Sequence, residues 1–374
     1  MKRWTLAAVA LTLTLPAAAF ADRIERTLPS APGQELEIDL RTGGAIDVRA
    51  GDDAAIHVIA DRGGSDAADI ELEIEGTAHG ARIASRYNGG RHSSDTDVKL
   101  DVRVPKHFDV RLKTMGGDVH LEGLEGSFSG ETMGGALELV SLTGKVALST
   151  MGGEIHAERS HLDGKVSTMG GNVLIEDVEG DLKGSSMGGQ VTYKNAGPVR
   201  AGGAAIDMSS MGGDLNVDQA PNGARLSTMG GNVRVRSASS YVKAETMGGD
   251  VMLDRVDGWI DAQTMGGRVT ATVVGDATKG RRDVRLESKS GDLHLTVPAD
   301  FDMDIDIELV YTRNSTRRYR VDSDLPLKIE ESKDWESNYG TPRKVIHATG
   351  RVGTGAARIV LRTVNGDVTL TREH

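Results

Sequence analysis

The sequence predicts an all-β protein whose central part is a parallel β-solenoid, and three observations lead to that prediction. A four-residue motif, Thr or Ser followed by Met-Gly-Gly, occurs nine times, and seven of the eight steps between its methionines are 18 residues long. Between the motifs, apolar and polar residues alternate as they do in strands. Glycine accounts for 48 residues and aromatic residues for only 3%, a composition typical of short strands and tight turns. A short fixed period indicates one structural unit stacked on itself.

Residues 1–21 have the features of a secretory signal peptide. Lys2 and Arg3 are followed by an apolar run from Leu6 to Leu15 and by small residues up to Ala21, after which cleavage is expected. The run is shorter than the ~20 residues that a membrane-spanning helix needs, and no later stretch approaches that length. We therefore expect an exported protein, periplasmic or extracellular, without a transmembrane segment.

The charge and cysteine content exclude several classes of partner and site. The formal net charge is −11, and loss of Lys2 and Arg3 with the signal peptide would make it −13. This balance argues against nucleic acid and against anionic membrane surfaces as partners. The chain has no cysteine, so disulfides and thiolate metal sites are excluded. Stability must come from burial and backbone pairing.

The segments on either side of the repeats contain strand patterns but lack the period. We expect residues 22–110 to form an N-terminal β cap, residues 111–297 to form the solenoid, and residues 298–374 to form a C-terminal β cap that ends in a degenerate repeat. Caps are expected because a solenoid otherwise has two open sheet edges, which invite aggregation.

Each coil, numbered from its methionine as position 1, contains two runs of alternating residues. Positions 5 and 7 are almost always apolar and positions 14 and 16 are apolar or small, as in Val251, Leu253, Ile260 and Ala262. No hairpin signal is present, so each strand should pair in parallel with its copy in the next coil, about 4.8 Å away. A hexapeptide left-handed helix would need apolar residues at positions 11 and 17, which are polar here, and the calcium β-roll motif is absent.

Position 3 is glycine in every repeat and in three degenerate copies, at residues 41–48, 288–295 and 363–370. A positive φ, or a close approach of neighbouring coils that a Cβ would block, would explain this. Position 2 tolerates Ser290 and Asn365, as an ordinary turn position does. The glycines expected to be structural, besides Gly44, are Gly117, Gly135, Gly153, Gly171, Gly189, Gly213, Gly231, Gly249, Gly267, Gly291 and Gly366.

The methionines are expected to form a ladder on one outer edge. Position 16 faces inward, so position 18 does too, and the methionine that follows at the corner faces outward; Lys289 occupies this position in one degenerate copy. The ordinary interpretation is packing that shields the glycine corner, and the functional alternatives are soft-metal binding, oxidation or a contact surface. The ladder comprises Met115, Met133, Met151, Met169, Met187, Met211, Met229, Met247 and Met265.

A second candidate metal site is a column at position 6. His120, Glu138 and His156 would stack on successive rungs of an outer face, where a transition metal could bridge them. The alternative is an ordinary polar ladder, and we expect no resident cofactor.

Basic residues in an acidic chain are the remaining candidates for binding. Two coils carry six extra residues, which bring Lys194 and Arg200 into one loop and Lys279, Arg281 and Arg282 into the other; loops on a rigid scaffold often carry function. Arg317 and Arg318 lie in the basic segment YTRNSTRRYR, which could bind an acidic glycan or a lipid headgroup. Each group could equally be a solvated charged surface.

Two segments resemble a known family. The stretch VRVPKHFDVRLKTMGGDVHL (102–121) and the ending ARIVLRTVNGDVTL (357–370) are similar to the bacterial putative-adhesin β-strand-repeat family, a domain of unknown function. The resemblance implies an exported β-solenoid at the cell envelope, with adhesion as the implied role and no catalytic residues to transfer. The present chain departs from the family pattern because it has Met-Gly where the family has a variable residue followed by Ser.

These observations together predict a non-enzymatic exported β-solenoid that acts as a binding or adhesin-like scaffold of the cell envelope or surface. Its partner would be an envelope component, a glycan or a protein. One alternative is a carbohydrate-active β-helix enzyme, which would need clustered carboxylates in a groove. Another is a periplasmic soft-metal-binding protein that uses the methionine ladder.

Overall fold

The computed structural model describes residues 22–64, 67–88, 96–195, 203–315, 317–337 and 340–373. The expected signal peptide lies outside these ranges. Within them the regular structure is β, apart from one short 3-10 helix, η1 (Ala67–Asp69). None of the helical structure in these ranges is long and apolar enough to cross a membrane.

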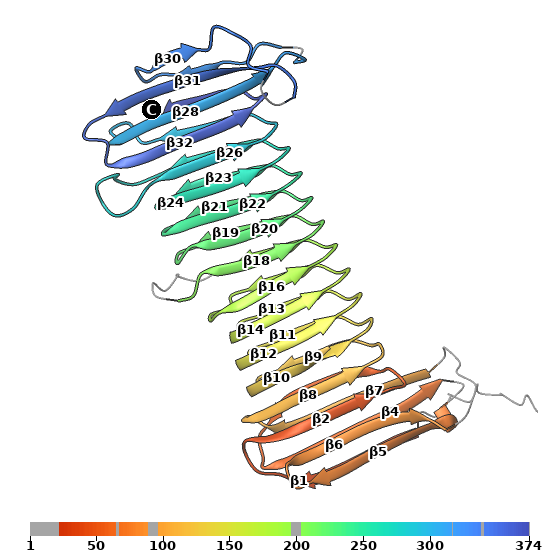
Figure 1. Ribbon diagram of the computed structural model, residues 1–374. Coiled ribbons are helices and arrows are strands. Elements are labelled where there is room, and N and C mark those ends of the chain that lie inside the picture. The colour runs from red at the N-terminus through yellow and green to blue at the C-terminus, as the bar shows by residue number, and fades with distance from the viewer. Residues whose placement is uncertain are drawn as a thin grey trace, which may run out of the picture.

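Two long sheets run side by side along an elongated molecule, with the N-terminal strands at one end and the C-terminal strands at the other (Figure 1). The first sheet has the order β1 (Asp22–Pro29), β4 (Ala55–Gly64), β7 (Thr96–Pro105), β3 (Ala45–Gly51), β9 (Val119–Glu122), β11 (Leu137–Val140), β13 (Ile155–Glu158), β15 (Val173–Glu176), β17 (Val191–Lys194), β19 (Leu215–Ala220), β21 (Val233–Ala238), β23 (Val251–Val256), β25 (Val269–Val273), β27 (Leu293–Val297), β33 (Val368–Arg372) and β29 (Val321–Ser323).

The strand pairings place the second sheet in one line from β5 to β30. Its order is β5 (Ile70–Thr77), β6 (Gly80–Tyr87), β2 (Gln34–Leu40), β8 (Phe108–Thr114), β10 (Glu125–Thr132), β12 (Thr143–Thr150), β14 (His161–Thr168), β16 (Leu182–Ser186), β18 (Ile206–Ser210), β20 (Ala224–Thr228), β22 (Tyr241–Thr246), β24 (Trp259–Thr264), β26 (Val284–Ser288), β32 (Ala357–Val364), β28 (Met303–Thr312), β31 (Arg343–Val352) and β30 (Lys328–Glu331).

Each repeat contributes one strand to each sheet, and the register follows the sequence period. Leu137 of β11 pairs in parallel with Val119 on one side and with Ile155 on the other, each 18 residues away. The six extra residues of the longer coils leave the stack in register, since Gly184 of β16 pairs with Met208 of β18 and Ile260 of β24 pairs with Val284 of β26, each 24 residues away. The predicted parallel β-solenoid with two strands per coil is therefore confirmed.

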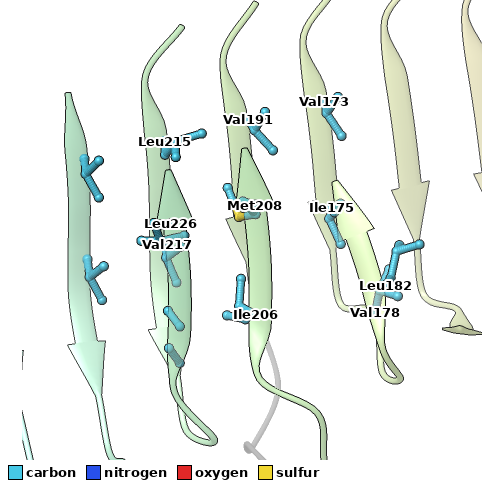
Figure 2. Packing of buried hydrophobic residues seen from close by; sticks show 14 of the residues in the cluster. Val173, Ile175, Val178, Leu182, Val191, Ile206, Met208, Leu215, Val217 and Leu226 are labelled. Carbon is cyan, nitrogen blue, oxygen red and sulfur yellow. The ribbon is translucent and has the colours of Figure 1, made fainter. Parts of the chain in front are cut away.

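The core is a narrow apolar layer between the two sheets. Positions 5 and 7 of the first sheet meet positions 14 and 16 of the second, and nearly all of the side chains involved are buried. Figure 2 shows this layer over several coils, with side chains from both sheets pointing toward one another. The labelled residues are Val173, Ile175, Val178, Leu182, Val191, Ile206, Met208, Leu215, Val217 and Leu226. Alternation in the sequence thus becomes an inner and an outer surface for each strand.

The two ends combine solenoid coils with antiparallel strands. At the N-terminal end, β2 and β3 pair in parallel with β8 and β9, so they form a coil of their own, while β4 and β1 extend the first sheet antiparallel. At the C-terminal end, β32 and β33 stack on β26 and β27 as a last coil. The strands β28, β31 and β30 then continue the second sheet beyond it.

Candidate functional site

The Thr/Ser-Met-Gly-Gly motif forms the corner where the chain leaves the second sheet and enters the first. Thr168, the last residue of β14, is buried, and its hydroxyl donates to the carbonyl of Gly153 at 2.8 Å. The same hydroxyl accepts the N–H of Gly171 at 3.1 Å. Equivalent pairs recur along the stack, for example through Ser186. The inward orientation predicted for position 18 is confirmed. The hydroxyl at this position links one glycine corner to the next by hydrogen bonds.

Position 3 is glycine because neighbouring coils approach closely there. A Cβ on Gly171 would lie well under 3.0 Å from the carbonyl oxygen of Gly153 in the coil before, and the same holds at each of the eleven position-3 glycines from Gly117 to Gly366. By contrast, a Cβ on Gly170 would have nothing nearer than 3.6 Å. Of the two explanations that the sequence offered, a positive φ applies to Gly117 but not to the ten glycines that follow it. For those ten, that explanation is wrong, and the close approach is the reason.

Position 4 adds a second ladder beside the corner. The carboxylate or amide oxygen at this position accepts the backbone N–H of position 4 in the next coil, as Asp214 does from Asn232 at 2.7 Å and Asn232 from Asp250 at 2.8 Å. This contact needs a short side chain with an acceptor oxygen, which explains the frequent Asp and Asn there. The corner is thus fixed by side chains on both sides of the glycine pair.

The nine methionines of the ladder face outward, as the parity of the strand predicts. Their exposed fractions lie between 44% and 51%, a uniformity that indicates the same placement in every coil. They line a groove of 710 Å³ from Met115 to Met229, and a second groove of 560 Å³ continues from Met229 to Met265. We call these together the methionine groove. The polar side of the groove is formed by position 17, whose residues are Lys113, Glu131, Ser149, Ser167, Ser185, Ser209, Ser227, Glu245 and Gln263.

The histidines of the column contact carboxylates along and across the rungs. His120 contacts Glu138 through Nδ1 at 3.0 Å and Glu122 through Nε2 at 3.4 Å. His156 lies 3.9 Å from Glu176 and, in register, pairs with Glu138. Among the residues that the structure describes, no group of three or more His, Cys, Asp or Glu side chains has a geometry that could hold a metal ion.

Of the basic candidates in the two longer coils, Lys279 and Arg281 form ion pairs with neighbouring carboxylates. Lys194 is exposed, but it ends strand β17 rather than lying in a loop, and Arg200 is outside the described residues. Lys279 pairs with Asp276 at 3.4 Å. Arg281 pairs with Asp283 at 2.9 Å and also lies over the Trp259 ring, 5.0 Å from its centroid.

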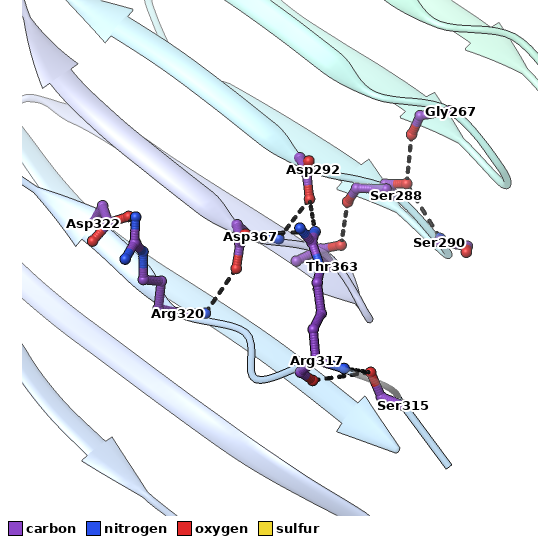
Figure 3. A network of polar contacts seen from close by, with 11 residues as sticks. Gly267, Ser288, Ser290, Asp292, Ser315, Arg317, Arg320, Asp322, Thr363 and Asp367 are labelled. Atoms are coloured by element: carbon purple, nitrogen blue, oxygen red, sulfur yellow. Dashed lines mark hydrogen bonds and ion pairs between the residues drawn. The ribbon is translucent and has the colours of Figure 1, made fainter. Parts of the chain in front are cut away.

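Arg282 and the basic segment near the C-terminus also differ from the sequence expectation. Arg282 pairs with Asp257, and its side chain is only 10% exposed, so it holds the loop in place. Figure 3 shows Arg317 between the carboxylates of Asp292 and Asp367, at 3.0 and 3.5 Å. Arg318 remains 84% exposed, with Glu331 at 3.4 Å. Arg282 and Arg317 are thus held by carboxylates of the fold, and Arg318 is the most exposed of the three.

Sequence reasoning missed the position-17 serines, which make up the central part of the polar side of the methionine groove. Ser149, Ser167, Ser185, Ser209 and Ser227 occupy this position in five successive coils. The signal was present in the sequence, since each of these serines lies two residues before a ladder methionine. The role of these serines can be recognised only when positions 17 and 1 are known to lie on the same side of the corner.

The fold and its corner define a two-sheet parallel β-solenoid with a repeated glycine corner. The chain belongs to the Toastrack DUF4097 family, whose model matches residues 34–324. No match was found among curated proteins.

Solved structures with similarity to the chain are of low sequence identity. A putative cell adhesion protein from Clostridium sporogenes ATCC 15579 is 8% identical, with 95% of this chain and 100% of that chain covered and a TM-score of 0.19. A putative adhesin from Parabacteroides distasonis ATCC 8503 is 17% identical, with 72% and 98% covered and a TM-score of 0.36. A putative lipid binding protein from the same organism is 13% identical, with 68% and 97% covered and a TM-score of 0.35.

Proposed function

We propose that this chain is a non-enzymatic, exported binding scaffold of the cell envelope, and that it holds an elongated partner, a glycan or a polypeptide, along the methionine groove. The observation that carries the proposal is the repetition of one half-exposed apolar surface over nine coils. A catalytic centre needs unlike groups that converge on one reacting atom. A surface repeated rung by rung instead suits a partner that is itself extended.

The energetics favour a partner that covers several rungs. Burying the exposed half of one methionine contributes about 1 kcal/mol, taken as roughly half of a full side-chain burial. Association costs about 4–15 kcal/mol in lost rotational and translational freedom. Contacts on one or two rungs therefore fall below this cost, whereas contacts on most of the nine rungs reach its range. Methionine suits such a contact because its flexible thioether side chain adapts to an irregular surface.

The test is a binding comparison on the mature protein, residues 22–374, with peptidoglycan, lipopolysaccharide and defined acidic and neutral glycans as probes. The groove variant replaces Ser149, Ser167 and Ser185 by Gln, the residue that occupies the same position at 263. A control variant replaces His156, Leu174 and Thr192 by Gln on the outer surface of the first sheet.

We expect the groove variant to lose at least about tenfold in affinity for the probe that binds, because filling the groove removes contact over three rungs. The control variant should bind like the wild type. Equal binding by both variants would place the partner elsewhere on the molecule. Turnover of any of these polymers at enzymatic rates would overturn the non-enzymatic part of the proposal.

A further inference from the structure

We propose that the methionine ladder binds soft monovalent metal ions, Cu(I) or Ag(I), and that each ion is coordinated by the thioethers of two adjacent rungs. This goes beyond the proposed function, because it concerns the sulfur atoms of the groove rather than its apolar surface.

The spacing of the rungs suits such a bridge. Consecutive ladder methionines lie on hydrogen-bonded neighbours, since the N–H of Gly170 donates to the carbonyl of Met151 at 3.0 Å and that of Gly188 to Met169 at 2.9 Å. The longer coil does not interrupt the ladder, because Gly212 donates to Met187 at 2.9 Å. Parallel rungs are about 4.8 Å apart. A bond from sulfur to a small d¹⁰ ion is about 2.3 Å, so two such bonds in line span about one rung.

The ligand set selects the class of metal. Thioethers are soft donors that favour Cu(I) and give little affinity for magnesium or calcium. The chain contains no cysteine that would compete as a stronger soft ligand. The sulfur-bearing side chains are about half exposed, so an ion can reach them without unfolding the corner. The net charge of −11 also raises the local concentration of cations.

The fold itself does not require methionine at this position. The three degenerate coils make the same kind of corner with Thr42, Lys289 or Val364 at position 1. In two of them, the position-3 glycines Gly291 and Gly366 approach the coil before as closely as the repeat glycines do. Covering the corner with apolar area could be achieved by Leu or Val. What only methionine supplies in all nine repeats is a thioether, one on every rung.

The experiment uses two variants that each lose four methionines to Leu and differ only in adjacency. The alternating variant combines M133L, M169L, M211L and M247L, and the five remaining thioethers then have no neighbour on the next rung. The block variant combines M211L, M229L, M247L and M265L, which leaves five adjacent thioethers. Mature wild type and both variants are titrated with Cu(I) against a chromophoric chelator in the absence of oxygen, and with Ag(I). Circular dichroism verifies that all three are folded.

We expect the wild type to bind up to four ions, as nine thioethers allow, and the block variant to bind about two. The alternating variant should lose at least about tenfold in affinity, because its second thioether is no longer held at high effective concentration. X-ray absorption should show two sulfur neighbours per Cu(I). Equal affinity of the two variants would overturn the bridging arrangement, and absence of saturable binding by the wild type would overturn the proposal.

The metal proposal and the proposed function fail separately. The Leu variants keep the groove apolar, so binding of an envelope polymer should survive in both of them while metal binding distinguishes them. A wild type that binds metal but none of the polymers would contradict only the proposed function, and a wild type that binds a polymer but no metal would contradict only the metal site.

Discussion

Replacing Gly171 by Ala tests whether the close approach of neighbouring coils is the reason for glycine at position 3. The new Cβ would overlap the carbonyl oxygen of Gly153, so the two coils must separate at this point. Overpacking of this kind costs about 1–3 kcal/mol. Separation also stretches the two hydrogen bonds of the Thr168 hydroxyl, at 2.8 and 3.1 Å, each worth about 1 kcal/mol. We therefore expect a destabilisation of roughly 3–5 kcal/mol.

The control is Gly170→Ala, one residue earlier. A Cβ there has no neighbour closer than 3.6 Å, and the φ of Gly170 is not in the left-handed region. Alanine should be neutral or should stabilise by about 0.4–1 kcal/mol through the unfolded state. Urea unfolding followed by circular dichroism, with hydrogen exchange at neighbouring rungs to detect local opening, measures both variants. Equal effects of the two substitutions would refute the close-approach argument.

Three further predictions concern the corner hydroxyl and the C-terminal end. Thr168→Val should cost about 2–4 kcal/mol in urea unfolding, because it leaves a buried N–H and a buried C=O unpaired, whereas Thr168→Ser should cost far less. The pKa of Asp302 is lowered to about 2 by N–H donors from Ala356, Thr354 and Gly355 and by the Thr354 hydroxyl. The stabilising effect of this carboxylate is therefore present above about pH 4 and lost as the pH falls toward 2. Asp302→Asn should remove that part of the acid dependence of thermal unfolding, and an unchanged profile would contradict the assignment. Deletion of residues 298–374 should expose strands β26 and β27 and cause association, seen by light scattering; a monomeric truncated protein that unfolds cooperatively would refute the capping role.

Much of the fold could be predicted because the solenoid repeats its contacts. An 18-residue period fixes which residue stacks on which, and the alternation of Val251 and Leu253 with polar neighbours fixes the inner surface. The outward position of the methionines followed from the same parity. Local pattern and global register agree along nearly all of the stack, the exception being a register shift between Leu253 and Val256 where β23 pairs with β25. Short stretches of sequence therefore carry long-range information.

The remaining features depend on contacts that have no period. The coil formed by β2 and β3 is separated from the repeats by strands β4 to β7, so its sequence reads as part of an irregular cap. Arg282 is buried against Asp257, 25 residues earlier, and Arg317 lies between two carboxylates from different coils. A basic side chain in a sequence gives no indication of such partners. The candidate binding cations were therefore predicted as exposed sites, and several of them are structural ion pairs.

The central claim is that the nine ladder methionines form an outer groove open to solvent. Mild peroxide treatment of the folded mature protein, followed by peptide mass spectrometry, measures this directly, because thioether oxidation follows exposure. Met208 and Met303, each 1% exposed, are internal controls for burial, and Met252 at 40% is a control for exposure outside the groove. We predict that all nine ladder methionines oxidise at rates close to that of Met252 while Met208 and Met303 remain protected in the folded protein. Protection of the ladder methionines to the level of Met208 would place them inside the molecule and contradict the account.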